Sequence, residues 1–333
     1  MVHERCRVRL SNMNVIKSIL IIILLILLPA CSFHFVDRME PLTETIVSGR
    51  GKDKIVLIDI SGVISTKTRS GPSLLAQKRP NHVSRVREEL NKAFSDKRVK
   101  GLILRINSPG GGVTASDIIY REIKRFKASK GVPVVACMMD VATSGAYYIS
   151  MASDTILAHP TTITGGIGVI AFKFNTEGFL QKIGVKDESI KSGDKKDLFS
   201  PFRSNTEDEV RILGTIIDNL HGRFIDVIAE NRKELAVDEI ARLADGRVYT
   251  ANQAVILKLI DKIGYLDDAV DVVKKLAGIT DAKTVIYHRP FSYRRNIYSS
   301  TFHRETGAIN LINIDLGSME EFTGLKLMYL SVQ

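Results

Sequence analysis

Ser144 lies where an apolar segment, residues 134–139, gives way to small residues and then to a predicted helix. A serine held in such a strand-to-helix turn exposes its hydroxyl, and the free N–H groups at the start of the helix favour a developing negative charge. A nucleophilic serine needs that geometry. The simpler interpretation is that the small residues only let a helix pack closely on a sheet. This segment alone does not distinguish a nucleophilic serine from such a packing role, so evidence from the rest of the chain is needed.

A run of three glycines, residues 110–112, follows a second apolar segment at 101–106. Such a turn could bind phosphate through its backbone N–H groups, but its spacing matches neither GxGxxG nor GxxxxGK followed by Ser or Thr. The N–H groups can instead form an oxyanion hole, for which the N–H of Gly145 would be the second donor. The glycine turn and Ser144 both follow predicted strands, and ligands of parallel α/β sheets bind beyond the carboxyl ends of the strands.

Apolar segments alternate with helical periodicity along most of the chain, which predicts an α/β fold with a mainly parallel sheet. We expect strands at 54–60, 101–106, 133–139, 154–158, 164–169, 185–191 and 284–287. We expect helices at 82–95, from 116 onward, after Ser144, and at 174–183, 205–231, 237–243, 251–259 and 267–276. Residues 50–203 would form the α/β catalytic core, residues 204–288 a helical C-terminal part of the same domain, and residues 289–333 a basic, irregular tail.

The chain has 333 residues, a net charge of +10 and a sequence pI of about 9.4. This basic balance suits either nucleic acid or an anionic membrane surface. The sequence has no zinc-finger spacing, recognition helix or basic stripe interleaved with aromatic residues, which argues against nucleic acid. The three cysteines, Cys6, Cys31 and Cys137, are too few and too scattered for a disulfide framework or a metal site, and we expect no cofactor.

The first 40 residues have the pattern of a targeting segment. Basic residues precede an apolar run at 19–28, which predicts that the following chain is exported. The run is short for a membrane span, which needs about 20 residues. It leads into Leu-Pro-Ala-Cys, which resembles a bacterial lipobox and makes Cys31 the candidate lipidation site; the alternative is an uncleaved membrane anchor. We therefore expect the chain at the cell membrane of a bacterium, with its bulk on the periplasmic side.

Five motifs, in order between residues 54 and 279, resemble signal peptide peptidase A (SppA) in its short, single-domain form. They are NSPGGG at 107–112, TSGAYY at 143–148, TGGIGV at 164–169, KSG with KD and SPFR between 191 and 203, and GRVYT at 246–250. The resemblance implies the ClpP/crotonase fold of repeated ββα units and a membrane-bound serine peptidase with a Ser–Lys dyad. Its expected partners are remnant signal peptides and other exported apolar peptides, the membrane, and further copies of the chain in a ring-like homo-oligomer.

The resemblance also assigns roles to four residues of this chain. Ser144 would be the nucleophile and Lys196 the general base, while Gly111 and Gly145 would supply the oxyanion donors. In the short forms of the family the serine and the lysine are expected to meet across a subunit boundary.

A lysine that acts as a base must be neutral part of the time. Its pKa then has to fall from about 10.4 to about 8, which corresponds to roughly 3 kcal/mol of destabilisation of the ammonium. Burial does this best, and apolar residues follow at positions 198, 199 and 202. A carboxylate acts in the opposite direction, so we expect Asp197 to point away from Lys196. The residue types alone do not choose Lys196 over Lys195; the family register does.

Two positions bear on how well the dyad works. His159, which ends a predicted strand, is the alternative base, although it lies closer to the serine in sequence than the histidine of ClpP does. Where Gly166 stands, SppA sequences commonly carry a serine that orients the lysine amine. Thr164, Thr143 or a water would have to replace that serine, or the activity would be weak.

Two other functions are compatible with the same fold. A crotonase-like acyl-transfer enzyme is disfavoured by the export signal, because CoA is cytosolic, and by Ser144 itself. A non-catalytic or weakly active oligomeric scaffold is left open by the glycine at position 166.

Overall fold

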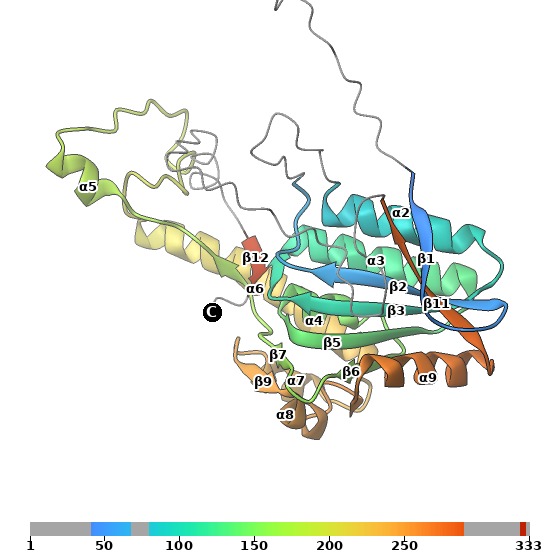
Figure 1. Cartoon of the computed structure of the whole chain (residues 1–333). Helices are drawn as coiled ribbons and strands as arrows, with labels where there is room; N and C mark the ends of the chain where they lie inside the picture. The colour runs from blue at the N-terminus through green and yellow to red at the C-terminus, as the bar shows by residue number, and fades with distance from the viewer. Residues whose placement is uncertain (1–40, 68–79, 290–326, 331–333) are drawn as a thin grey trace, which may run out of the picture. The chain divides into compact units, whose positions relative to one another are not determined.

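The computed structural model describes residues 41–67, 80–289 and 327–330 (Figure 1). The predicted targeting segment, with Cys31, and most of the tail after residue 289 lie outside these ranges. Among the described residues, no helix combines the length and the apolar character that a membrane crossing requires.

The main sheet contains nine strands of the described chain. Seven of them follow the order β1-β11-β2-β3-β5-β6-β10, and β7 pairs with β5 and with β9. The strands are β1 (Thr43–Gly49), β2 (Asp53–Ser61), β3 (Val99–Ser108), β5 (Val134–Thr143), β6 (Thr155–Ala158), β7 (Ile163–Gly165), β9 (Val248–Thr250), β10 (Lys262–Ile263) and β11 (Ala282–His288). Neighbouring strands run parallel, except β1 with β11 and β7 with β9. The prediction of a mainly parallel α/β sheet is confirmed.

Strand β2 shows why both faces of this sheet are covered. Its residues 54–60 are all buried. Val56 and Ile58 belong to one apolar cluster, whereas Ile55 and Leu57 belong to another. Because successive side chains of a strand point to opposite faces, each face of the sheet has its own core.

Helices pack over these two cores (Figure 1). One cluster includes residues of α2, α3, α4 and α6, and the other includes residues of α9. The helices are α2 (His82–Ser95), α3 (Val113–Lys130), α4 (Gly145–Ser150), α5 (Glu177–Lys182), α6 (Glu207–Asn231), α7 (Val237–Leu243), α8 (Ala251–Ile256) and α9 (Leu266–Ala277). The side chain of Asn81 accepts the N–H of Ser84 and caps α2, which begins and ends where the periodicity predicts.

A second, three-stranded sheet lies at the glycine turn. It consists of β4 (Gly110–Gly112), β12 (Leu327–Leu330) and β8 (Ile170–Ala171). The central strand β12 is antiparallel to both neighbours. The prediction of an irregular tail is therefore wrong for residues 327–330.

Other differences from the predicted elements have local causes. The strand expected at 185–191 is not formed. All of these residues are exposed, and none of them pairs with a strand of the described chain. The helix expected from residue 116 begins at Val113, because Gly112 already has the extended backbone of an N-cap. The helix expected at 174–183 is shortened to α5. Of the strand expected at 164–169, only the first two residues lie in a strand, β7, and the separate strand β8 begins at Ile170. Edge strand β1 was not predicted.

Candidate active site

Ser144 occupies the single residue between β5 and α4 and has φ 55° and ψ −118°. Ser144 and Lys258 are the two non-glycine residues of the described chain with positive φ. This backbone conformation belongs to the first central position of a type II′ turn, which glycine normally occupies. A residue held there typically costs about 1–3 kcal/mol, and such strain concentrates at functional sites.

Backbone hydrogen bonds hold the turn in this conformation. The N–H of Ser144 donates to the carbonyl of Gly165 at 2.7 Å, and the N–H of Tyr148 donates to the carbonyl of Ser144 at 2.9 Å. The residue is only 1% exposed, and its Oγ has no hydrogen-bond partner among the described residues. A buried hydroxyl without a partner is energetically unfavourable. The described chain therefore does not itself supply the group that would accept the proton of Ser144.

The glycine turn presents one N–H towards the same place. Ile64 donates its N–H to the carbonyl of Gly110 at 2.8 Å and accepts the N–H of Gly112 at 2.9 Å. The backbone groups of the intervening Gly111 therefore point away from Ile64. A Cβ on Gly111 would lie 2.1 Å from the carbonyl oxygen of Ile64, so no side chain fits there.

Gly145 lies directly against Gly111. A Cβ on Gly145 would be 3.2 Å from the backbone nitrogen of Gly111 and 2.4 Å from the hydroxyl of Ser116. The structure thus brings together three of the four predicted site residues: Ser144 and the backbone of the two glycines. Two N–H groups beside a nucleophile are what an oxyanion hole requires, although their roles here stay a prediction.

Lys196 does not reach this site within one chain. It lies in an exposed turn after α5, and no amine contacts the Ser144 hydroxyl in the described part of the chain. The predicted dyad therefore needs a lysine that arrives from elsewhere, as the expected subunit boundary would provide. The assignment of Lys196 as the base remains a prediction.

The neighbours of Lys196 are engaged in ion pairs. Lys195 contacts Asp208 at 2.6 Å, and this hydrogen bond raises the pKa of Lys195, which makes it a poor base. Asp197 pairs with Arg203 at 2.7 Å and with Lys191 at 2.6 Å, and these partners hold its pKa well below the ordinary value. The choice of Lys196 over Lys195 as the base stays a prediction that follows from the family resemblance.

The alternative groups raised by the sequence are placed differently. Nδ1 of His159 lies 2.8 Å from the hydroxyl of Thr161, and its ring packs edge-on against Tyr265. The hydroxyl of Thr164 donates to the carbonyl of Ala142 at 2.7 Å.

Thr143 and Gly166 bear on how a lysine would be oriented. The buried hydroxyl of Thr143, next to the nucleophile, has no partner among the described residues. Gly166 has φ 61°, a left-handed backbone conformation that glycine adopts more readily than serine.

A site residue that the sequence did not predict comes from β12. Tyr329 is fully buried, and its carbonyl oxygen would lie 3.2 Å from a Cβ on Gly145. Its signal in the sequence is a short apolar run near the C-terminus, too short to separate from a flexible tail.

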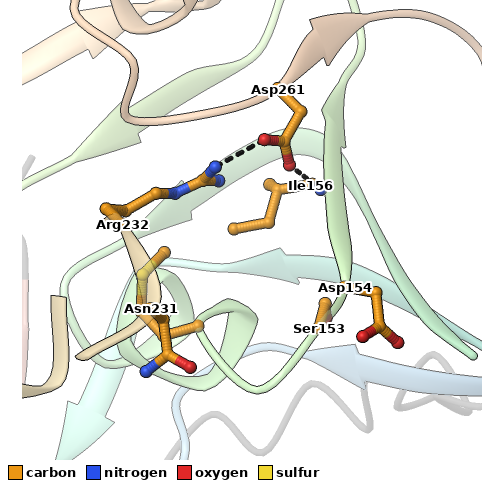
Figure 2. Close-up of a pocket in the computed structure, with 7 residues that line it drawn as sticks. Ser153, Asp154, Ile156, Asn231, Arg232 and Asp261 are labelled. Atoms are coloured by element: carbon orange, nitrogen blue, oxygen red, sulfur yellow. Dashed lines mark hydrogen bonds and ion pairs between the residues drawn. The ribbon is translucent and has the colours of Figure 1, made fainter. Parts of the chain in front are cut away.

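A small pocket at the end of α6 lies apart from these residues (Figure 2). Arg232 pairs with Asp261 at 2.6 Å, and Asp261 accepts the N–H of Ile156 at 2.6 Å, which ties the end of α6 to β6. The cavity measures about 20 Å³, which is room for one water molecule and not for a peptide side chain. No three His, Cys, Asp or Glu side chains gather as metal ligands in the described ranges.

Comparison with known proteins gives the family. A sequence profile of peptidase family S49 matches residues 126–280, and a Clp protease profile matches residues 74–162. A relative from Enterococcus faecium that carries the name signal peptide peptidase SppA is 38% identical over 253 residues, which cover 76% of this chain and 72% of the relative. The chain belongs to peptidase family S49. The resemblance indicated by the five motifs is confirmed.

Three further proteins are similar to this chain. A protein from Synechocystis sp. with a protease name is 37% identical over 232 residues, covering 70% of this chain and 77% of the relative. The chloroplast serine protease SPPA of Arabidopsis thaliana is 35% identical over 240 residues, covering 71% of this chain and 34% of the relative. A solved ClpP1 variant from Listeria monocytogenes aligns with TM-score 0.42 and 17% identity over 64% of this chain and 94% of that chain. This S49 member is a serine peptidase with a ClpP-like α/β fold.

Proposed function

We propose that this serine peptidase is a membrane-anchored endopeptidase with a Ser144–Lys196 dyad, and that it cleaves remnant signal peptides and other exported apolar peptides. The observation that supports it best is the strained, unpartnered serine beside the backbone of Gly111 and Gly145. The membrane anchor is supported by the basic and apolar pattern of the first 40 residues, with Cys31 as the lipid attachment site or an uncleaved apolar helix as the alternative.

The reaction proceeds through an acyl-enzyme. The neutral amine of Lys196 takes the proton of the Ser144 hydroxyl as Oγ attacks the carbonyl carbon of the peptide. The N–H groups of Gly111 and Gly145 stabilise the negative charge on the carbonyl oxygen. The C–N bond then breaks, and the lysine ammonium returns the proton to the leaving amine. Water, deprotonated by the same lysine, attacks the carbonyl carbon of the ester. The bond between this carbon and Oγ breaks, the acyl part leaves as a carboxylic acid, and the lysine ammonium returns the proton to Oγ of Ser144.

The lysine comes from a neighbouring copy of the chain in this proposal. Helix α5 has no buried residue, and the chain around it carries exposed apolar side chains. They include Phe179, Ile183, Val185 and Ile190. Apolar side chains gathered on an exposed segment are typical of a surface that another subunit covers. Assembly into a ring would bury these residues and supply the apolar environment that lowers the pKa of a lysine.

A fluorophosphonate probe tests the proposal on the full-length chain in membranes. Wild type should become labelled at the serine, whereas Ser144→Ala should not be labelled and Lys196→Ala should lose labelling and peptide hydrolysis by at least about a hundredfold. His159→Ala is the matched control and should keep most of both, because its ring contacts Thr161 and Tyr265.

Three results would contradict the proposal. Activity retained in Lys196→Ala but lost in His159→Ala would point to a triad. Labelling that persists in Ser144→Ala would place the nucleophile elsewhere. Absence of labelling both in wild type and in Tyr329→Ala, which removes a buried side chain beside Ser144, would favour the non-catalytic scaffold.

A further inference from the structure

The outer surface of α2 and α3 carries positive charge. The two helices pack against each other on one face of the main sheet (Figure 1). In these helices and in the connection at 96–98, the charged residues that lie exposed are all basic: Arg87, Lys97, Arg98, Arg121 and Arg125. Among the described residues, Arg98 alone of these five forms an ion pair, with Asp96 at 3.3 Å. The outward charge of this helical layer is therefore largely uncompensated.

The acidic residues of the same layer are engaged elsewhere. Four of them have a basic partner within 3.2 Å: Glu88 with Arg289, Glu89 with Arg85, Asp96 with Lys54 and Asp117 with Arg223. The fifth, Glu122, is half-buried. These carboxylates are thus occupied by other cations and leave the exposed arginines and Lys97 available to an outside partner.

Helical spacing gathers the exposed residues on one surface. Arg87 and Phe94 lie two turns apart on α2, and Arg121 and Arg125 lie one turn apart on α3. Phe94 is 49% exposed, and Nζ of Lys130, at the end of α3, lies 5.6 Å from the centre of its ring and donates to its carbonyl at 2.7 Å. This contact joins the ends of the two helices. We call the resulting surface the basic face; it consists of Arg87, Phe94, Lys97, Arg98, Arg121 and Arg125.

Further lysines crowd the margin of the basic face. Burial lowers the pKa of Lys124, and the nearby ammonium of Lys127 lowers it further. Burial also lowers the pKa of Lys130, and Lys100 adds to this effect. Like charges held this close repel one another, and an anionic partner would relieve the repulsion.

The chain enters its folded core beside the basic face. The first described residues begin at 41, and Lys92 of α2 donates to the carbonyl of Leu42. Glu44 of β1 contacts Lys54 at 2.6 Å, and Lys54 contacts Asp96 at 2.8 Å. The segment that follows the predicted membrane anchor is thereby fixed to α2 and to the connection after it. An anchor joined to the core at this point brings the basic face within reach of lipid head groups.

We propose that the basic face docks on anionic phospholipid head groups of the membrane that anchors the chain, with the ring of Phe94 inserted among them. The inference rests on the proposed membrane anchor, and it adds the protein surface and the lipid chemistry of the contact. Basic side chains bind an anionic membrane surface electrostatically, and a second attachment of this kind strengthens a lipid anchor. An aromatic ring among them adds apolar contact at the boundary between head groups and acyl chains.

Docking of this kind would orient the peptidase. Helices α2 and α3 cover one face of the main sheet, and α9 covers the other. The membrane would therefore lie on the α2–α3 side, with α9 directed away from it. The basic face contains no residue of the 174–203 segment, so assembly into a ring through the exposed apolar side chains of that segment leaves the basic face available.

The test uses the natural absence of tryptophan from this chain. Phe94→Trp introduces one tryptophan into the basic face, and the full-length variant is reconstituted into vesicles of phosphatidylcholine with or without one third phosphatidylglycerol. In the anionic vesicles, its emission should shift to shorter wavelength and be quenched by brominated lipid. Neither change should occur in neutral vesicles. Raising the salt from about 0.1 M to about 1 M should reverse both changes, because the screening length falls from about 10 Å to about 3 Å.

Two triple variants in the Phe94→Trp background separate the basic face from net charge. The first reverses the basic face, Arg87→Glu/Arg121→Glu/Arg125→Glu. The second makes the same change in charge at three exposed basic residues of α7, β10 and α9, Arg242→Glu/Lys262→Glu/Lys275→Glu. The first should lower the ratio of docked to undocked protein in anionic vesicles by at least about a hundredfold, and the second should keep the shift and the quenching. An equal loss in both variants would overturn the assignment to the basic face.

Docking and anchoring fail in different ways. Protein that floats with both kinds of vesicle but shows the same emission in both would overturn the docking and leave the anchor standing. Protein that floats only with anionic vesicles, with shifted emission, would contradict the anchor and support the basic face. A DNA duplex provides the third arm: a tryptophan that responds to the duplex and not to anionic vesicles would make the basic face a nucleic-acid site and overturn the proposal.

Discussion

Ser144 joins two features that ordinary core residues avoid, a left-handed φ of 55° and a buried hydroxyl without a partner. The surrounding glycines explain how this is tolerated. Gly111 and Gly145 let the backbone of Ile64 and the hydroxyl of Ser116 approach to distances that any Cβ would block. The residue types around the serine therefore follow from the close approach of three backbone segments.

At the residue scale, we predict that Thr143 orients the lysine amine, because position 166 carries glycine in place of serine. Its hydroxyl is buried and unpartnered in the described chain, whereas that of Thr164 donates to the carbonyl of Ala142. Thr143→Val should lower kcat about tenfold and shift the pH–rate profile to higher pH, because a hydrogen bond to the neutral amine is lost.

The control for this prediction is Thr164→Val. It removes a hydroxyl of the same size that is bonded to backbone, so it should lower the melting temperature and leave the pH–rate profile in place. An unshifted profile in Thr143→Val would exclude Thr143 from orienting the base.

At the scale of elements, Arg203 connects the turn that carries Lys196 to the first turn of α6. Its guanidinium contacts Asp197 at 2.7 Å and the buried Glu209 at 2.6 Å. Arg203→Ala should lower kcat about tenfold, because a loosened turn positions the lysine less often. It should also lower the melting temperature, because the buried carboxylate of Glu209 loses its partner. Arg211→Ala is the control, since its contact with Asp208 is exposed and 3.6 Å long.

The same network gives a pH dependence with a defined sign. Arg203 holds the pKa of Glu209 at about 2, and Arg203 and Lys191 hold the pKa of Asp197 below its ordinary value. Carboxyls with lowered pKa stabilise the fold above their unfolded pKa of about 4 and lose that contribution as the pH falls. The turn should therefore remain ordered at neutral pH and loosen below about pH 4, which proteolysis of the 191–203 segment would detect. Equal cleavage at pH 3 and pH 7 would contradict this.

Elements with strong periodicity could be predicted from the sequence, and those that depend on distant partners could not. The bounds of α2 and the buried run of β2 follow from local pattern and capping. Strand β12 exists because β4 and β8 lie on its two sides, and those strands are formed by residues far away in sequence. The segment at 185–191 has strand-like residues, but no strand among the residues that the structure describes pairs with it.

The same distinction applies to the site. Ser144, Gly111 and Gly145 follow two neighbouring parallel strands, so their convergence could be predicted from the end positions of β3 and β5. Tyr329 and Phe224 could not be predicted, because their contact joins α6 with a strand about a hundred residues later in the chain. A long contact of this kind leaves no periodicity in the sequence.

At the scale of the whole molecule, one buried carboxyl makes stability depend on pH. Glu89 on α2 is 3% exposed, and burial raises its pKa to about 7 even though Arg85 lies 3.0 Å away. A raised carboxyl pKa means that the folded state keeps a proton the unfolded state releases. Its contribution is complete below the unfolded pKa of about 4.5 and is lost as the pH rises towards 7.

Glu89→Gln tests this linkage. The variant keeps the size of the side chain without the charge, so its melting temperature relative to wild type should rise by several degrees between pH 5 and pH 8. Glu88→Gln is the control, because that side chain is 41% exposed and pairs with Arg289 at the surface. A melting-temperature difference that is independent of pH would show that Glu89 is already ionised at pH 5.

The conformation of Ser144 has a consequence for which substitutions would accumulate if selection for hydrolysis were lost. Glycine adopts φ 55° with little penalty, so a lineage that no longer needed hydrolysis would gain stability by exchanging this one serine for glycine. Gly111 and Gly145 cannot be exchanged in the same way, because Ile64 and Ser116 occupy the space that a side chain would fill. In homologues that have lost activity, the serine at position 144 should therefore be replaced before the glycines at 111 and 145. A serine retained at position 144 indicates that the homologue still catalyses hydrolysis.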